Sequence, residues 1–246
     1  MSSNIIEQLK DDKNYYGELG RNYLSNSDIY SLLNNPRDFR KNEKTLPLIM
    51  GRYFHTAMLE PSKIGEYAVV DSSTRSTKVF KEYVVENNLD NYDVLLQKEI
   101  ETIDTWIQAM QSNFTMYSDI YMDQNMYEQP GVVELFGMKW KGKADIINHD
   151  EELVIDLKTT SSIKSFRQSA RRFNYDSQAY IYSKLFGYEM VFIVIDKSSH
   201  VIGVYDCSPD FYERGERKVE EASHVYDLFF NTEGFDPSNY LINETL

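Results

Sequence analysis

The stretch Leu153-Val154-Ile155-Asp156-Leu157-Lys158-Thr159-Thr160 combines an apolar run with an acid and a base two residues apart. In a β-strand, residues i and i+2 point to the same face, so Asp156 and Lys158 would project together. Burying a charge is costly unless the charge is paired or binds a metal. The stretch therefore predicts a strand that carries either an ion pair or a functional site.

The length and composition of the chain favour one domain over residues 1–246, because 246 residues can bury a sizeable core without disulfides. The single Cys207 excludes an internal disulfide framework and a four-cysteine zinc or iron–sulfur site, and it fits a reducing cytoplasm. No stretch approaches the roughly 18 consecutive apolar residues of a membrane helix. Met1–Lys10 also lacks the apolar core of a signal peptide. We expect a soluble cytoplasmic protein with no membrane partner.

Charge is segregated along the chain. The net charge of −13 comes from 26 Lys and Arg against 39 Asp and Glu, which argues against a protein that coats nucleic acid non-specifically. The net charge does not exclude a local basic groove, because basic residues gather in the sequence around Leu153–Thr160. These residues are Lys139, Lys141, Lys143, Lys164, Arg167, Arg171 and Arg172.

The first half of the chain, residues 1–127, is mainly helical in pattern. A polar lead-in with a helix at Ile5–Lys10 precedes a short helix that Pro36 ends. The segment Pro47–Glu60 has an apolar helical stripe with His55 beside it, and alone this histidine is typical of a hydrogen-bonded core or boundary residue. Further helices are predicted at residues 76–87, 93–112 and 117–127.

After Pro130 the apolar period changes to that of strands, which predicts a sheet core over residues 128–206. The predicted strands cover residues 131–136, 137–147, 153–158, 190–195 and 201–205, with a helix at 173–186 between the third and the fourth. Alternation of apolar and charged residues over 138–145 indicates a half-buried antiparallel strand. A helix from Ser208-Pro209 to about Phe230 and an irregular tail complete residues 207–246.

The predicted hairpin before Leu153 brings two acids together. If its turn centres on Asp150-Glu151, paired residue numbers sum to about 300, which places Asp145 opposite Ile155 or Asp156. Neighbouring carboxylates repel and need a cation, either Lys158 or a divalent metal such as Mg²⁺ or Mn²⁺. With a metal present, Lys158 is free to orient a water molecule or to neutralise a phosphate.

The arrangement Asp145…Asp156-Leu157-Lys158 resembles the PD-(D/E)XK nuclease motif, with Ala144 in the place of the proline. A bare motif of this kind occurs often by chance. Three further segments are similar to those of the RecB-like and RecE-like branch, and the four together cover residues 24–187. They are the Gly51-x-x-x-His55 helix, the Gln178-x-x-x-Tyr182 helix, and the entry segment formed by Leu24–Ser27 and Pro36–Phe39.

The resemblance implies a restriction-endonuclease-like α/β fold, with a central mixed β-sheet flanked by helices and an N-terminal helical elaboration. It implies a Mg²⁺ or Mn²⁺ ion held by His55, Asp145, Asp156 and the backbone carbonyl of Leu157. Asp145, Asp156, Lys158, Gln178 and Tyr182 would form the catalytic group. A further acid is expected from Glu134 or Glu128, although Glu134 is as compatible with a structural surface charge.

The resemblance also implies contacts to DNA. The candidate residues are Arg52, Lys143, Lys164, Arg167, Arg171, Arg172 and Tyr175. The motifs look most like RecE-type phage exonucleases (exodeoxyribonuclease VIII-like), which implies 5′→3′ resection of linear double-stranded DNA ends, a ring-shaped homo-oligomer, a single-strand-annealing partner and, for a phage protein, the host cytoplasm.

Two alternatives stay open. The same site would serve an endonuclease or a junction resolvase, because the catalytic residues do not encode where on DNA they act. A non-catalytic binding or interaction protein is the other alternative, in which Asp156 and Lys158 are a plain ion pair.

Overall fold

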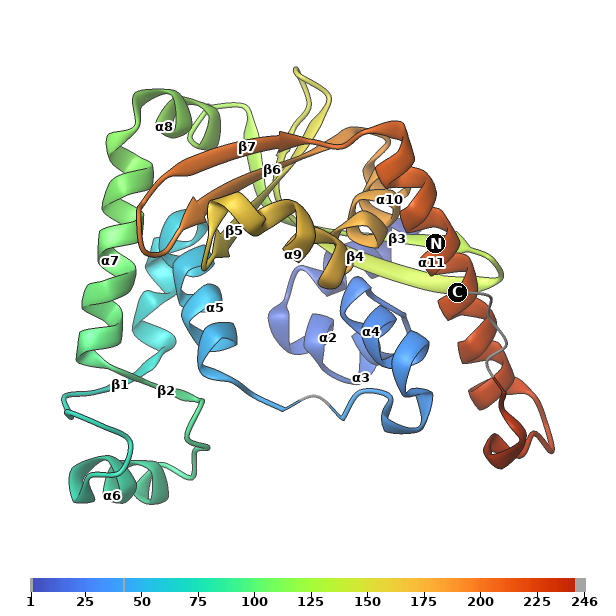
Figure 1. The fold of residues 1–246 in the computed structure, drawn as a ribbon, viewed down its shortest axis with the longest axis horizontal. Helices are drawn as coiled ribbons and strands as arrows, with labels where there is room; N and C mark the ends of the chain where they lie inside the picture. The colour runs from blue at the N-terminus through green and yellow to red at the C-terminus, as the bar shows by residue number, and fades with distance from the viewer. Residues whose placement is uncertain (1, 42, 242–246) are drawn as a thin grey trace.

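The core of the molecule is a five-stranded mixed β-sheet with helices on both faces (Figure 1). The computed structural model describes residues 2–41 and 43–241. The sheet order is β3-β4-β5-β6-β7, and only β5 and β6 run parallel. The strands are β3 (Asn125–Leu135), β4 (Met138–Asn148), β5 (Leu153–Thr160), β6 (Glu189–Asp196) and β7 (Ile202–Asp206). The mixed α/β architecture predicted from the sequence is confirmed.

The sheet forks between β4 and β5. Their antiparallel register pairs Ile146 with Ile155, and toward Asp145 and Asp156 no further residues of the two strands pair. The free edge of β4 is used instead by Leu24, whose N–H donates to Lys139 O at 2.8 Å and whose carbonyl accepts from Lys141 N at 2.8 Å. The fork therefore leaves Asp145 and Asp156 side by side where the two strands part.

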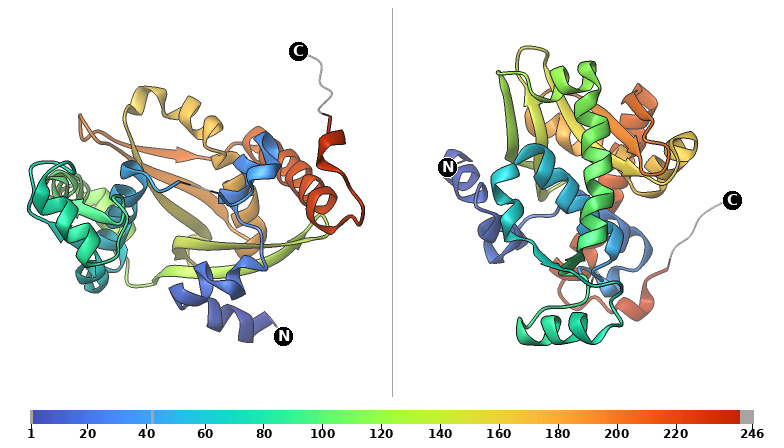
Figure 2. Two further views of the ribbon diagram at one scale, coloured as in Figure 1. Left: turned by 90° about the horizontal axis from the view of Figure 1, so that it is seen from below. Right: turned by 90° about the vertical axis from the view of Figure 1, so that its left-hand side faces the viewer.

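Alternating residues of the central strands enter two separate cores. Val154, Phe192 and Val194 pack on the face covered by α4, α10 and α11. Ile155, Leu157 and Ile193 pack on the face covered by α5 and α7. This period of two is that of a strand buried on both faces, and Figure 2 shows the helices on either side.

The helices surround this sheet and differ in length. The α-helices are α1 (Ser2–Leu9), α2 (Asp12–Tyr16), α3 (Glu18–Arg21), α4 (Asn26–Asn34), α5 (Leu46–Leu59), α6 (Lys78–Glu86), α7 (Gln97–Ser112), α8 (Phe114–Ile120), α9 (Phe166–Arg172), α10 (Tyr175–Phe186) and α11 (Pro209–Tyr226). Short 3₁₀ or π turns are η1 (Pro36–Asp38), η2 (Pro61–Glu66), η3 (Ile163–Ser165), η4 (Asp227–Asn231) and η5 (Pro237–Asn239). No helix in the described ranges is long and apolar enough to cross a membrane.

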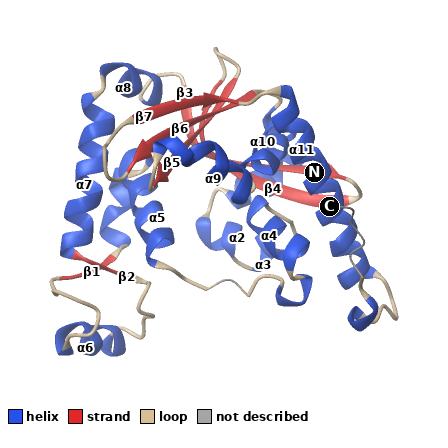
Figure 3. Cartoon of the chain, viewed as in Figure 1, coloured by secondary structure: helices blue, strands red, loops and turns tan. Residues whose placement is uncertain are grey.

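A small lobe lies at the N-terminal end of α7, where a short strand leads into that helix (Figure 3). The strands β1 (Ala68–Val70) and β2 (Val94–Leu96) pair in parallel, and α6 packs on them through a separate core of Val70, Phe80, Val94 and Leu96. The predicted helix at 93–112 was wrong at its start, because the apolar residues 94–96 form the fully buried strand β2. The organisation of the chain as one domain stays a prediction.

Three other predictions from the pattern were wrong. The segment 117–127 is not one helix, because α8 ends at Ile120 and β3 begins at Asn125. The polar lead-in forms three helices rather than one, and α2 covers part of the charged face of β4. Lys141 is consequently only 6% exposed, so β4 is buried on both faces there and not half-buried as its alternation indicated.

Candidate active site

Five polar side chains from four elements form one network at the fork of the sheet. Asp145 Oδ2 on β4 accepts a hydrogen bond from Leu157 N at 2.8 Å and lies 3.1 Å from His55 Nδ1 on α5. Asp156 on β5 accepts a hydrogen bond at Oδ1 from Gln178 Nε2 on α10 at 2.5 Å. Its Oδ2 lies 2.5 Å from Lys158 Nζ. The structure thus brings together residues that are far apart in the sequence.

The helix α10 is locked in place by its packing against α11. Asp176 is 1% exposed and accepts a hydrogen bond from Lys218 Nζ at 2.8 Å. Gly215 on α11 allows the close approach, because a Cβ there would lie 2.1 Å from the carbonyl oxygen of Asp176. Because Asp176 is anchored and lies two residues before Gln178, the side-chain amide of Gln178 is held where it reaches Asp156.

The two carboxylates have opposite pKa shifts. Burial raises the pKa of Asp156, and the neighbouring Asp145 adds to this, although Lys158 opposes it. Burial also acts to raise the pKa of Asp145, but the attraction of His55, Lys158 and the Leu157 N–H outweighs it, so that the pKa is lowered. Asp145 in turn raises the pKa of His55 against the effect of burial. The pKa of Asp156 is thus shifted above that of Asp145.

The donor set at the fork fits a hard divalent cation in its chemistry. Asp156 Oδ2 is buried, and the ammonium group of Lys158 lies 2.5 Å from it. A buried carboxylate next to a second carboxylate is a place where a cation, either the lysine or a metal ion, lowers the free energy. Within residues 2–41 and 43–241, however, no three His, Cys, Asp or Glu side chains are already gathered as a metal cage.

Glu128, rather than Glu134, lies next to the carboxylate pair. Tyr127 pairs with Ile146 and Gln129 with Ala144, so Glu128 stands opposite Asp145 across β3 and β4. Burial and then Asp145 raise the pKa of Glu128 to about 8. Glu134 instead pairs with Lys139 near the hairpin turn, six residues further along β3. Its distance along the strand, roughly 20 Å, separates it from the proposed metal ligands.

The hairpin turn was the signal that could have placed Glu128. Phe136 and Gly137 both have positive φ, of 50° and 75°, which is typical of the two-residue turns that fix hairpin register. Centring β3 and β4 on this turn puts Glu128 opposite Asp145 without further information.

Tyr182 and Tyr175 lie near the network but contact different atoms. The hydroxyl of Tyr182 donates to Lys143 O at 3.0 Å and accepts from Lys143 N at 3.3 Å, so Tyr182 fastens α10 to the strand of Asp145. Gly142 makes room for it, because a Cβ there would lie 2.4 Å from the Tyr182 ring. The ring of Tyr175 lies 4.9 Å from Lys158 Nζ and stacks on Phe192. Tyr175 therefore confines the lysine.

Five of the six predicted DNA-contacting cations are exposed, and Lys143 is not. Arg52 on α5 is exposed one turn before His55, and a second exposed set follows β5 on η3 and α9. The second set consists of Lys164, Arg167, Arg171 and Arg172. Among the described residues none of these five forms an ion pair, whereas Lys143 is 8% exposed and paired with Asp12.

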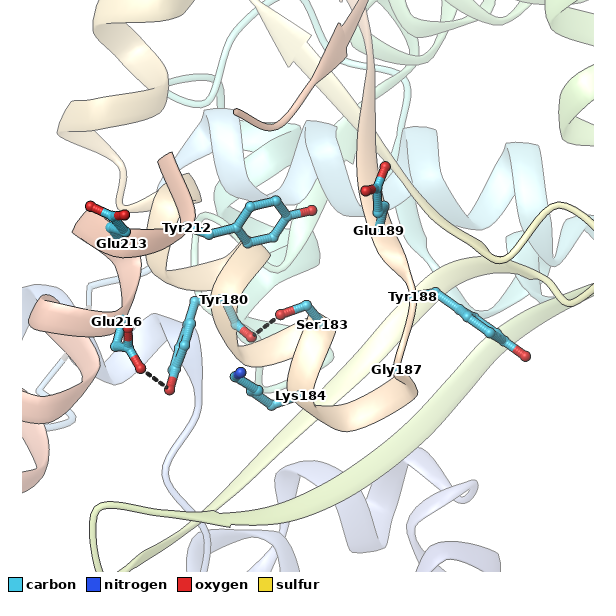
Figure 4. Close-up of a pocket in the computed structure, with 9 residues that line it drawn as sticks. All are labelled: Tyr180, Ser183, Lys184, Gly187, Tyr188, Glu189, Tyr212, Glu213 and Glu216. Atoms are coloured by element: carbon cyan, nitrogen blue, oxygen red, sulfur yellow. Dashed lines mark hydrogen bonds between the residues drawn. The ribbon is translucent and has the colours of Figure 1, made fainter. Parts of the chain in front are cut away.

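A surface pocket of about 390 Å³ lies away from this network, between α10, α11 and the start of β6 (Figure 4). It is lined by residues such as Tyr180, Lys184 and Glu213, and it includes none of the residues predicted for the site. The hydroxyl of Tyr180 donates to Glu216 Oε1 at 2.9 Å across its wall. This pocket is thus separate from Asp145 and Asp156.

Comparison with known proteins identifies related families and folds. A family model described as "PDDEXK-like domain of unknown function (DUF3799)" matches residues 28–237. No curated protein sequence matches the chain.

Two solved structures match the chain, and the first is similar in fold. The crystal structure of a protein from Eubacterium rectale named "Putative exonuclease" has a TM-score of 0.62 at 17% identity, covering 96% of this chain and 95% of that one. A phage-related exonuclease from Haemophilus somnus 129PT has a TM-score of 0.37 at 13% identity, covering 85% of this chain and 95% of that one. At these identities the first likeness concerns the fold alone.

Proposed function

The chain belongs to the PDDEXK-like family DUF3799, and on this premise we propose that it is a metal-dependent deoxyribonuclease acting on linear double-stranded DNA as an exonuclease. The observation that carries the proposal is the convergence of His55, Asp145, Asp156, Lys158 and Gln178 at the fork of the sheet. Buried acids that crowd one another, beside a lysine, are costly as plain structure and are typical of a functional site.

The residues have separable roles in this proposal. Asp145, Asp156 and the Leu157 carbonyl would hold Mg²⁺ or Mn²⁺, with His55 and Glu128 as further donors at the same place. Such an ion supplies Lewis-acid stabilisation of the phosphate and an activated water. Gln178 holds Asp156 in position through its Oδ1.

Lys158 is suited to act as a cation throughout the working pH range. The attraction of Asp156 raises its pKa although burial acts to lower it. Packed by Tyr175, its ammonium group can position a water and offset the negative charge that develops at phosphorus. Uncompensated cations on α9 and Arg52 would hold the DNA backbone.

The finer assignment is a RecE-type exonuclease that resects DNA ends 5′→3′. The motif resemblance supports this assignment, and the name "Putative exonuclease" of a protein with a similar fold agrees with exonuclease activity. A ring-shaped homo-oligomer and an annealing protein as partner go with this assignment.

The test compares linear and covalently closed circular duplex DNA in Mg²⁺, with Lys158→Met as the inactive control. We expect wild type to shorten end-labelled linear duplex and to leave the closed circle intact, and EDTA to stop the reaction. The polarity follows from placing the label at the 5′ or the 3′ end. Cleavage of the closed circle would instead establish the endonuclease or resolvase alternative.

The non-catalytic alternative predicts a different result. If Asp156 and Lys158 were a plain ion pair, wild type and Lys158→Met would both leave all DNA substrates intact, and calorimetry would detect no Mn²⁺ binding. The repulsion between Asp156 and the neighbouring buried Asp145 argues against a plain ion pair, since a pair of Asp156 and Lys158 needs no second carboxylate beside it.

A further inference from the structure

Two lysines beside the carboxylate centre share one acid from the N-terminal helices. Lys143 Nζ donates to Asp12 Oδ1, and Lys63 Nζ lies 3.4 Å from Asp12 Oδ2. Each lysine also has an acid of its own, since Lys63 Nζ lies 2.6 Å from Glu60 Oε1 and Lys143 Nζ lies 4.0 Å from Glu128 Oε2. Lys143 precedes Asp145 by two residues on β4, and Lys63 lies on η2, directly after the helix that carries His55. The Asp12 carboxylate thus bridges one cation on β4, the strand of Asp145, and one on η2, the turn that follows the helix of His55.

The helix α2 covers Lys143 almost completely. The ammonium group of Lys143 lies 4.7 Å from the ring of Tyr15 and 5.5 Å from the ring of Tyr16. The side chain of Lys143 is 8% exposed, whereas those of Asp12 and Lys63 are 45% and 37% exposed. The cation is therefore withheld from solvent by a helix whose own acid stays partly in water.

The arrangement around Asp12 is that of a site for a singly charged anion. A carboxylate and a phosphodiester each carry one negative charge, spread over two oxygens, and both form charge-assisted hydrogen bonds to ammonium groups. Residues i and i+2 of a strand share a face, so Lys143 projects on the same side of β4 as Asp145. A backbone phosphate bound there would lie next to the proposed scissile position.

We propose that Lys63 and Lys143 form a phosphate-binding subsite for the DNA backbone, and that Asp12 occupies this subsite when DNA is absent. The inference rests on the proposed function, because it assigns a place to the substrate of the same centre. DNA then has to displace Asp12 and the α2 helix in order to bind. Asp12 lies outside the family match, which begins at residue 28, while both lysines lie within it.

The test measures binding of a short fluorescein-labelled duplex by anisotropy, in EDTA so that no cleavage occurs, over a series of salt concentrations. Asp12→Asn removes the competing charge and should tighten binding about threefold to tenfold. Glu18→Gln is the matched control, since it changes the net charge equally and Glu18 is exposed on the neighbouring α3, where it has no ion pair among the described residues. It should change the affinity by less than about twofold.

A double-mutant cycle separates the subsite from general electrostatics. Lys143→Gln should weaken binding and make the slope of log K against log salt shallower by about 0.9, the effect of one lost phosphate contact. In that background Asp12→Asn should tighten binding less than it does in wild type, because Asp12 then competes only at Lys63. If Lys143→Gln does not fold, Lys63→Gln at a more exposed position gives the matching comparison, since Asp12→Asn should again tighten binding less than it does in wild type.

The outcomes distinguish this inference from the proposed function. Wild type that binds and cleaves DNA, with Asp12→Asn equal to Glu18→Gln, overturns the subsite alone. Equal tightening by Asp12→Asn with and without Lys143 does the same. Wild type that neither binds nor cleaves DNA overturns the proposed function and the subsite with it.

Discussion

Two buried aspartates on neighbouring parallel strands have contrasting surroundings. Asp156 on β5 and Asp196 at the end of β6 are 2% and 6% exposed. Asp196 accepts hydrogen bonds from the backbone N–H groups of Ser199 at 3.0 Å, Ile163 at 2.8 Å and Ser198 at 2.9 Å, which together lower its pKa to about 2. Asp156 instead meets a second carboxylate, and burial raises its pKa.

The difference shows that the partners of a buried acid, and not its burial, indicate its role. Three backbone donors satisfy Asp196, which ties the segment after β5 to the β6–β7 turn and so stabilises the fold. Asp156 lies beside the carboxylate of Asp145 and is paired with Lys158, and the proposed functional centre would account for the cost of this crowding. Substitutions at the two positions should therefore separate activity from stability.

The largest effect is expected for Asp156→Asn. We expect nuclease activity on linear duplex to fall on the order of a thousandfold, because the centre loses a charged oxygen ligand. The free energy of unfolding should change by less than about 1 kcal/mol, since the lost attraction to Lys158 is offset by relief of repulsion from Asp145. Product gels and urea denaturation measure the two quantities. A large loss of stability with full activity per folded molecule would make Asp156 structural.

Gln178→Ala should reduce activity about tenfold to a hundredfold, because it releases Asp156 Oδ1 without removing a carboxylate. The matched control is Gln108→Ala, at an exposed position on α7. Initial rates on end-labelled duplex compare the two variants. Equal rates for Gln178→Ala and the control would show that Asp156 is held by other contacts.

Asp196→Asn should lower the free energy of unfolding by about 2 kcal/mol, because an amide cannot accept from all three backbone donors at both of its ends. Activity per folded molecule should be unchanged, since Asp196 lies outside the network of Asp145 and Asp156. Chemical denaturation measures the change in unfolding free energy, and the nuclease rate divided by the concentration of folded protein measures the activity. A loss of activity without a loss of stability would contradict the contrast between the two aspartates.

The contribution of Asp196 should also depend on pH in one direction. Its pKa is lowered from an ordinary value of about 3.9 to about 2, so its stabilisation is complete above about pH 4 and is lost as the pH falls toward 2. The difference in unfolding free energy between wild type and Asp196→Asn should shrink over that interval. Asp123→Asn, at an exposed position, is the control and should show no such change.

Much of the sheet and the placement of Asp145 could be predicted from local patterns. The turn after Asn148 sets the register, and the observed sum of 301 for Ile146 and Ile155 is close to the expected 300. The start of α7 could not be predicted, because the apolar run 94–96 fits a helix and a strand equally and only its pairing with β1 decides. The roles of the site residues stay predictions.

The contacts of Lys141 and Lys143 on β4 could not be predicted from the sequence either, for a different reason. Alternation along β4 identifies a charged face but does not reveal what covers it. The cover is α2, a five-residue helix in a polar segment with no apolar stripe of its own. Its aromatic and acidic groups meet Lys141 and Lys143 only through the tertiary fold.

The fork of the sheet gives the protein a spectroscopic reporter. Because β4 and β5 part beyond Ile146 and Ile155, the Leu157 N–H donates to the Asp145 carboxylate at 2.8 Å instead of to a strand carbonyl. The amide proton of Leu157 therefore senses the electron density of that carboxylate directly. In ¹⁵N-correlated NMR spectra, the chemical shift of the Leu157 amide would change when Mg²⁺ binds at the proposed centre. The amide resonances of the residues that pair β4 with β3 would not change.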